Sequence, residues 1–205
     1  MIMNAPELVL HLHVSRPEAQ LLRVDIRAEN TSSRELYWLN KHWTTSGRGQ
    51  VAWDPQGPYR HEQGGILRLL YGAAPVPPNM FVNNRYIPHA TRIDAGSAAD
   101  VRAEVIVPVE EFALFEPPSD AAEYGEIEAH FLAVIAHYVV AEDGILINPS
   151  FVDPTYFWVR APNQLVRVAE AVIETDAIPV RRRRDTIARA QLQEEVHREA
   201  AREQA

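Results

Sequence analysis

Apolar and polar residues alternate along most of this chain. Residues 8–14 read Leu-Val-Leu-His-Leu-His-Val, residues 22–28 place Leu, Val, Ile and Ala at every second position, and residues 101–107 repeat the pattern with Val and Ala. A period of two is typical of a β-strand with one buried face and one exposed face. Polar turn clusters follow the first two segments, at 15–20 and at 29–33. The first part of the chain is therefore predicted to form antiparallel strands.

The longest apolar stretch, Glu126–Val140, has apolar residues on both faces of a period-two pattern in its second half. A helix is the competing interpretation, because Ala and Leu are compatible with either element. A strand is favoured, since the Glu-Asp-Gly sequence at 142–144 is a hairpin turn signal and the alternation resumes at Ile145. The segment is therefore predicted to be a central strand, buried on both faces in its second half.

Further short strands are expected at 36–39, 66–71 and 156–159, with turn signals between them. About eight to ten short strands without alternating helices predict an all-β fold, an antiparallel β-sandwich. The run of strand, polar turn at Asn30 and strand, followed later by a turn before Val101, resembles an immunoglobulin-like sandwich in outline. This resemblance concerns architecture, which hosts many functions and implies none by itself.

The C-terminal residues differ in character from the rest. The change predicts a β-sandwich domain at 1–178 and a separate C-terminal segment at 179–205, with Pro179 ending the sandwich. Four consecutive arginines at 181–184 open this segment. Such a run can bind nucleic acid or an acidic lipid. The alternatives are a solvated entrance to a helix and a patch that docks on the acidic body of the chain itself.

A C-terminal helix is expected to follow the arginines. Asp185 and Thr186 are both residues that cap helices, and the pattern continues to about Arg202. Its apolar stripe, which includes Leu192 and Val196, is narrow. A helix with so narrow a stripe is not stable alone, so it is expected to dock on its own body or on a partner.

Composition narrows the possible functions. The 205 residues are 46% hydrophobic and 23% charged, enough apolar residues for a folded core. The chain has no cysteine, which excludes disulfides, zinc–thiolate sites, iron–sulfur clusters and thiol nucleophiles. A formal net charge of −8 argues against nucleic acid or an anionic membrane as the main partner. No apolar run reaches the roughly 18–20 residues of a membrane helix, and residues 1–14 lack the basic start of a signal peptide, so a cytoplasmic location is expected.

Residues 41–65 are rich in glycine and proline and hold Trp43, Trp53 and Tyr59. This composition predicts a long loop, with one short strand at 50–53. Flat aromatic faces with polar edges stack on sugars and on peptides, so the three rings are candidates for a contact surface. Alternatively, the rings fill the core and fix the loop, as is expected of Trp38 in its strand.

His11 and His13 stand two residues apart on a predicted strand, so their side chains share one face and could share a metal ion. With Glu18 they have a spacing similar to that of the ligands in cupins, which are also antiparallel β proteins. The resemblance implies a metal site at these three residues. The chain departs from the cupin pattern because residues 1–10 and 21–30 contain no glycine. The alternative is that both histidines lie on the polar face of an amphipathic strand.

No catalytic set emerges from the sequence, because the serines lie in turn contexts without a nucleophile elbow and no paired carboxylates are identifiable. We therefore expect a non-enzymatic β-sandwich without a cofactor, a component of a bacterial assembly or homo-oligomer that binds another protein. Its expected contact surfaces are the 41–65 stretch and the C-terminal helix. Their candidate partner-binding residues are Trp43, Trp53, Tyr59, Arg181, Arg182, Arg183, Arg184, Leu192 and Val196. The alternatives are a carbohydrate-binding module that uses the aromatic loop and a cupin-like metal-dependent enzyme.

Overall fold

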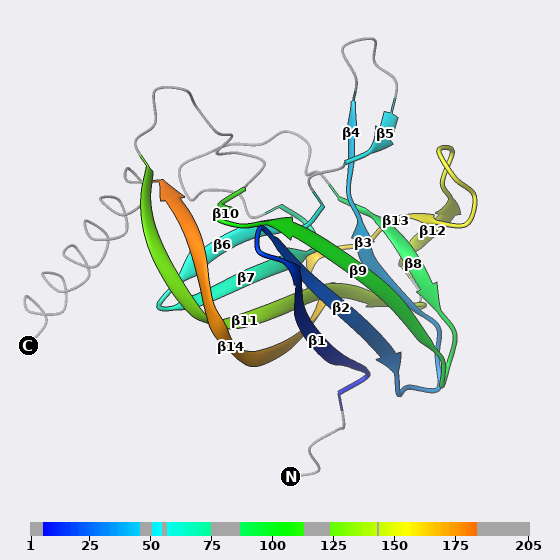
Figure 1. The fold of residues 1–205 in the computed structure, drawn as a ribbon. Helices are drawn as coiled ribbons and strands as arrows, with labels where there is room; N and C mark the ends of the chain where they lie inside the picture. The colour runs from blue at the N-terminus through cyan, green and yellow to red at the C-terminus, as the bar shows by residue number, and fades with distance from the viewer. Residues whose placement is uncertain are drawn as a thin grey trace, which may run out of the picture.

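The computed structural model describes residues 6–45, 51–54, 57–74, 87–112, 124–142 and 144–183. In these ranges the regular elements are strands, apart from one 3-10 turn at Asn163–Leu165 (Figure 1). No helix in the described ranges is long and apolar enough to cross a membrane. The strands are β1 (Leu8–Glu18), β2 (Leu21–Asn30), β3 (Leu36–Lys41), β4 (Trp43–Thr45), β5 (Val51–Trp53), β6 (Tyr59–Gln63), β7 (Ile66–Tyr71), β8 (His89–Ile93), β9 (Ala98–Ile106), β10 (Val109–Glu110), β11 (Tyr124–Val140), β12 (Leu146–Pro149), β13 (Phe157–Arg160) and β14 (Arg167–Arg183).

The all-β prediction is confirmed, and β11 is a strand as predicted. Three described strands, in the order β1-β2-β9, form one antiparallel sheet. Nine described strands form a larger sheet along the path β10-β14-β11-β3-β8-β13-β12, with β7 beside β11 and β6 beside β7. This sheet is mixed, since β7 runs parallel to β11 and β10 parallel to β14. The expectation of antiparallel pairing throughout is corrected there, because a long stretch of chain separates each parallel pair and permits a crossover.

The larger hydrophobic core consists of the inward-facing apolar side chains of both sheets. Strand β2 contributes Val24 and Ile26, and β11 contributes Leu132 and Val134. All four side chains are at most 1% exposed. Full burial of an aliphatic side chain of this size contributes roughly 1.5–3 kcal/mol, so these alternating positions hold the two sheets together.

A smaller core covers part of the opposite face of the larger sheet. Tyr37 and Leu39 alternate with the inward-facing Trp38 on β3 and point into this second core, where they meet Val139 and Val159. The covering chain comes from β12, β13 and the 3-10 turn that follows them. Strand β3 and the end of β11 are therefore buried on both faces. Among the described residues, the middle of β11 and most of β14 lack this cover.

Asn30 joins two of the three places where the described chain crosses between the two sheets. Its side-chain Nδ2 donates to the carbonyl of Arg34 at 2.7 Å, on the connection from β2 to β3. The same nitrogen donates to the carbonyls of Ile93 at 3.0 Å and Asp94 at 3.1 Å, on the connection from β8 to β9. Its Oδ1 accepts from the backbone N–H of Ser32. A fully buried amide is tolerated because both of its ends are hydrogen-bonded.

A bulge in the pairing of β11 with β14 changes which residues of β11 face the core. Ala129 faces inward before the bulge, and Leu132 faces inward after it. Ala129 pairs with Ile178 whereas Phe131 pairs with Glu174, so the extra residues of the bulge lie on β14. A bulge of this kind bends the strands and re-aims the side chains beyond it. Phe131 is thereby turned to the outside of the sheet.

Residues 41–65 contain three strands where the sequence predicts a long loop with one. Strands β4 and β5 form a two-stranded pair, and β6 forms a hairpin with β7. The hairpin turns at Gly64 and Gly65, whose φ angles of 63° and 80° favour glycine. The loop prediction is corrected because several of these glycines and prolines mark the ends of short strands rather than one continuous loop.

Strand β14 continues past Pro179, where the sequence predicts the end of the β-domain. Ile178 and Val180 are both fully buried, and β14 pairs with β11 on either side of the proline. Core contacts at these alternating positions hold the strand in register, and the described strand extends to Arg183. Residues 184–205, which include the predicted helix, lie outside the described residues.

Candidate functional site

The middle of β11 and the facing part of β14 expose apolar side chains on the outer face of the larger sheet. Phe131 is 41% exposed, Val168 is 59% exposed and Val172 is 53% exposed. The two valines lie opposite alternate residues of β11, on the side to which Phe131 and the half-buried Ile135 point. We name these four residues, Phe131, Ile135, Val168 and Val172, the outer apolar face.

The amino-acid pattern of β11 explains this surface. Leu132 and Val134 fill the core side of the strand, so the residues between them must point outward. The predicted burial on both faces is found at Val139 and Val140, where the second core covers the strand, and also at Ala133, which is 0% exposed between Leu132 and Val134. Phe131 lies beyond that cover. Strands that are apolar on both faces are typical of sheets with a layer packed on each side.

Two carboxylates border the outer apolar face. Glu170 and Glu174 alternate with the exposed valines on β14, and they lie opposite Ile135 and Phe131. Both side chains are exposed. The surface therefore combines apolar contact area with negative charge.

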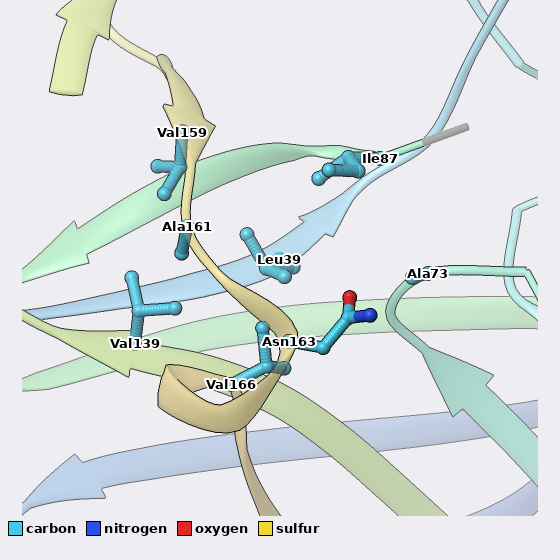
Figure 2. A pocket seen from close by; sticks show the side chains of 8 residues that line it. All are labelled: Leu39, Ala73, Ile87, Val139, Val159, Ala161, Asn163 and Val166. Carbon is cyan, nitrogen blue, oxygen red and sulfur yellow. The ribbon is translucent and has the colours of Figure 1, made fainter. Parts of the chain in front are cut away.

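An apolar pocket lies farther along the outward row of β11, at Val139 (Figure 2). Its free volume is only about 20 Å³, and it is partly open to solvent. The polar member of its lining is Asn163, whose side chain points toward Ala73 in Figure 2. A small apolar depression suits one aliphatic side chain rather than a large ligand. Its lining residues are Leu39, Ala73, Ile87, Val139, Val159, Ala161, Asn163 and Val166.

Trp43 and Trp53 come together at one end of the larger sheet, as cross-strand neighbours on β4 and β5. The Nζ atom of Lys41 lies 5.3 Å from the centre of the Trp53 ring and 4.9 Å from that of Tyr156. The Trp53 ring also meets His89 edge to face at 5.4 Å, and Trp43 stacks beside the same histidine at 6.2 Å. Contacts of these kinds contribute roughly 0.5–1.5 kcal/mol each, so the cluster fixes this end of the sheet. Its predicted binding of a carbohydrate or a protein stays a prediction.

Tyr59 lies apart from the two tryptophans. It is buried, with the His42 ring edge-on at 4.7 Å and the Phe112 ring stacked at 5.7 Å. His42 and Trp43 are consecutive in extended chain and point to opposite sides. Tyr59, which contacts His42, therefore lies on the other side from the two tryptophans.

Phe151, which no sequence pattern marks, is 77% exposed. It lies in a turn, where no periodic signal marks an exposed ring.

The basic run forms ion pairs within the fold. Arg181 pairs with Glu110 at 2.8 Å. Arg182 pairs with Glu62 at 3.2 Å, where the side chains of Arg182 and Glu62 are 16% and 4% exposed. Two charges this deeply buried require each other, because an unpaired charge in such a place is strongly destabilising. Arg181 and Arg182 therefore tie the end of β14 to β10 and β6.

The remaining predicted contact residues are at or beyond the end of β14. Arg183 is its last residue. Arg184, Leu192 and Val196 lie outside the described residues. Their role in contacting a partner stays a prediction.

His11 and His13 lie on the exposed face of β1. The Nε2 atom of His11 is 3.3 Å from Oε2 of Glu29 on the neighbouring strand. Glu18 ends β1 at the hairpin, roughly 15 Å along the strand from His13. No group of three or more His, Asp or Glu side chains in the described ranges is placed to hold a metal ion. The two histidines thus occupy the polar face of an amphipathic strand.

Three other histidines, His42, His89 and His137, lie wholly or partly inside the fold. Burial disfavours the charged imidazolium and lowers the pKa of each, that of His42 to about 4. All three are therefore neutral at neutral pH. The Nδ1 atoms of His89 and His137 have no hydrogen-bond partner among the described residues. These two rings pack as uncharged aromatic groups, and nothing around them forms an acid–base pair in the described part of the chain.

Comparison with family models, with curated proteins and with solved structures found no match to this chain. Function is therefore inferred from the chemistry of the surfaces themselves.

Proposed function

We propose that this chain is a non-enzymatic protein-binding component of a larger assembly, and that the outer apolar face is its contact surface. One observation supports this most directly. Phe131, Val168 and Val172 are each at least 41% exposed and point to the same side of two paired strands, where the half-buried Ile135 lies diagonally between the two valines. Single exposed apolar residues are common in folded proteins, whereas several on one face of a sheet favour a contact site.

An immunoglobulin-like β-sandwich is the architecture that we propose for this component. The shared core of the two sheets and the two chain crossings at Asn30 support it. Such a scaffold holds strand residues rigidly, so a partner meets a surface that is already formed. Affinity then comes from a few anchors, and Phe131 with the two valines fills that role.

The apolar pocket at Val139 supports the same function. It lies on the outward side of β11, as does the outer apolar face. An apolar side chain from a partner that entered the pocket would leave Asn163 at the edge of the contact. This arrangement resembles the common anatomy of an interface, with apolar anchors at the centre and polar groups at the rim.

A photo-crosslinking experiment on the full chain tests this proposal. A photoreactive amino acid is placed at Val172, and, as a matched control, at Ile106 on the tip of β9, which is 73% exposed. We expect position 172 to crosslink one discrete protein in the source cells and position 106 not to do so. The crosslinked protein is then purified, and its Kd for the unlabelled chain is measured.

A second variant shows whether the apolar contact matters. Val168→Asp places a charge on the same face of β14 as the crosslinker, four residues away from it, and a buried unpaired charge is strongly unfavourable in an interface. We expect it to abolish the crosslink and to weaken the purified complex at least about tenfold, with an unchanged thermal unfolding midpoint. Equal crosslinking from positions 172 and 106, or an unchanged Kd for Val168→Asp, would show that this face is not the contact surface.

A further inference from the structure

Five exposed carboxylates lie on the two strands that carry the outer apolar face. Glu170, Glu174 and Asp176 are exposed on β14, and Glu126 and Glu128 are exposed on β11 before the bulge. None of the five forms an ion pair or a side-chain hydrogen bond with another described residue. The outer apolar face is therefore edged by negative charge that the described part of the fold leaves uncompensated.

The outer face of the three-stranded sheet has a different charge arrangement. There Arg23 pairs with Glu104 at 2.9 Å across β2 and β9, and Arg102 pairs with Asp25 at 2.7 Å across the same strands. Opposite charges on neighbouring strands of that sheet thus neutralise each other. Glu170 and Glu174, which alternate with the exposed valines, have no such basic neighbour across the strand pair, because they lie opposite Ile135 and Phe131.

We propose that the partner of the outer apolar face presents apolar side chains flanked by lysines or arginines, as a basic amphipathic segment of another protein does. This inference rests on the proposed function and adds the chemistry of the partner to it. The apolar side chains would pack on Phe131, Val168 and Val172. The cations would pair with the carboxylates that alternate with these residues, above all Glu170 and Glu174.

A second copy of this chain is a poor occupant of the same surface. Two copies meeting through this face would bring their rows of carboxylates together, and like charges across an interface disfavour association. A basic partner removes that repulsion and is attracted before contact. Exposed ion pairs add little affinity individually, so the charges select the partner while the apolar residues bind it.

Three synthetic peptides test the inference with the full chain. The first repeats leucine and lysine with the helical period, as Leu-Lys-Lys-Leu-Leu-Lys-Leu, to form a basic amphipathic helix. The second replaces its leucines with serine, and the third replaces its lysines with glutamate. Binding is followed by fluorescence anisotropy at low and at high ionic strength. We expect the lysine–leucine peptide to bind most tightly and to weaken as salt is added.

Variants separate the two contributions. Glu170→Gln with Glu174→Gln removes two charges from the border of the face and should weaken the lysine–leucine peptide about fivefold. The matched control, Asp100→Asn with Glu104→Gln, removes two exposed charges from the three-stranded sheet and should leave the Kd unchanged. Val172→Asn removes apolar contact area and should weaken the same peptide while its salt dependence remains.

The outcomes distinguish this inference from the proposed function. If the glutamate–leucine peptide binds as tightly as the lysine–leucine peptide and Val172→Asn weakens both, the face is a contact surface but its partner is not basic. If Val172→Asn has no effect on any peptide, the face is not a contact surface and both proposals fail. A homodimer in native mass spectrometry that Val172→Asn abolishes would overturn the inference by making a second copy the occupant. Equal weakening by the control pair would reduce the binding to nonspecific attraction by net charge and would overturn it as well.

Discussion

Gly72, at the end of β7, occupies a position where the structure leaves no room for a side chain. A Cβ atom added there would lie 2.4 Å from both Cγ and Nδ1 of His137 and 2.7 Å from its Cβ. Nonbonded carbon atoms prefer separations of about 3.5–4.0 Å. His137 cannot retreat easily, because the atoms in question are the first atoms of its side chain. They are fixed by the backbone of β11, which pairs with β7 on one side and β14 on the other.

The cost of Gly72→Ala follows from this contact. Overpacking in a well-ordered interior typically costs about 1–3 kcal/mol, since neighbouring side chains or strands must shift. Alanine also lowers the conformational entropy of the unfolded chain, which stabilises the folded state by about 0.4–1 kcal/mol. The net loss in the free energy of unfolding should therefore be about 1–2 kcal/mol. For a chain of this size, such a loss lowers Tm by roughly 2–8 °C.

A double-mutant cycle isolates the contact. Urea unfolding is measured for the parent chain, Gly72→Ala, His137→Ala and the double variant, with the slope m checked for constancy. His137→Ala removes two of the three close atoms, so Gly72→Ala should cost less in that background, with a coupling of about 1 kcal/mol or more. Strict additivity, or a Gly72→Ala variant as stable as the parent, would refute the predicted crowding.

Two further predictions concern buried polar groups. Glu62→Gln removes the charge that faces Arg182 at 3.2 Å and should lower the free energy of unfolding by about 3 kcal/mol in denaturant titrations; a loss below about 0.5 kcal/mol would mean that solvent already screens the pair. Burial lowers the pKa of His42 to about 4 from an unfolded value of 6.5, so the unfolded chain takes up the proton first. Stability should therefore be constant above about pH 6.5 and fall by about 3 kcal/mol as the pH drops to 4. His42→Phe should flatten this part of the stability–pH profile, and a profile parallel to that of the parent would show that His42 is not responsible.

The sequence predicts the strands well where one face alternates with the other. Strand β7 and the long strand β11 follow directly from their apolar positions, because period-two burial is a local property of the chain. The prediction does not hold at Pro179, where a local breaker is outweighed by the burial of Ile178 and Val180 on either side of it. It also does not hold across residues 41–65, where glycine and proline signal turns without showing how short the strands between them are.

The candidate surface could be predicted only in part. Apolar residues on both faces of β11 are visible in the sequence, but the bulge that turns Phe131 outward depends on pairing with β14. Strand pairing also determines which charged side chains form ion pairs. Arg182 pairs with Glu62, which is distant in the sequence, whereas Glu174 has no described partner. Long-range register of this kind is set by the whole fold, so no local pattern reveals it.

The hydrogen bonds of Asn30 have a consequence for the order of folding. Its amide is satisfied by carbonyls on two connections that lie 63 residues apart in the chain, Asn30 itself standing on one of them. An intermediate that lacks the connection from β8 to β9 would leave the buried Nδ2 group with the carbonyl of Arg34 alone, without the carbonyls of Ile93 and Asp94, at a cost of about 1–3 kcal/mol. Such an intermediate is therefore sparsely populated, and the amide protons of β2 and β8 are expected to exchange with solvent through the same global opening event. The hydrogen bonds of this one side chain therefore couple the unfolding of the two sheets.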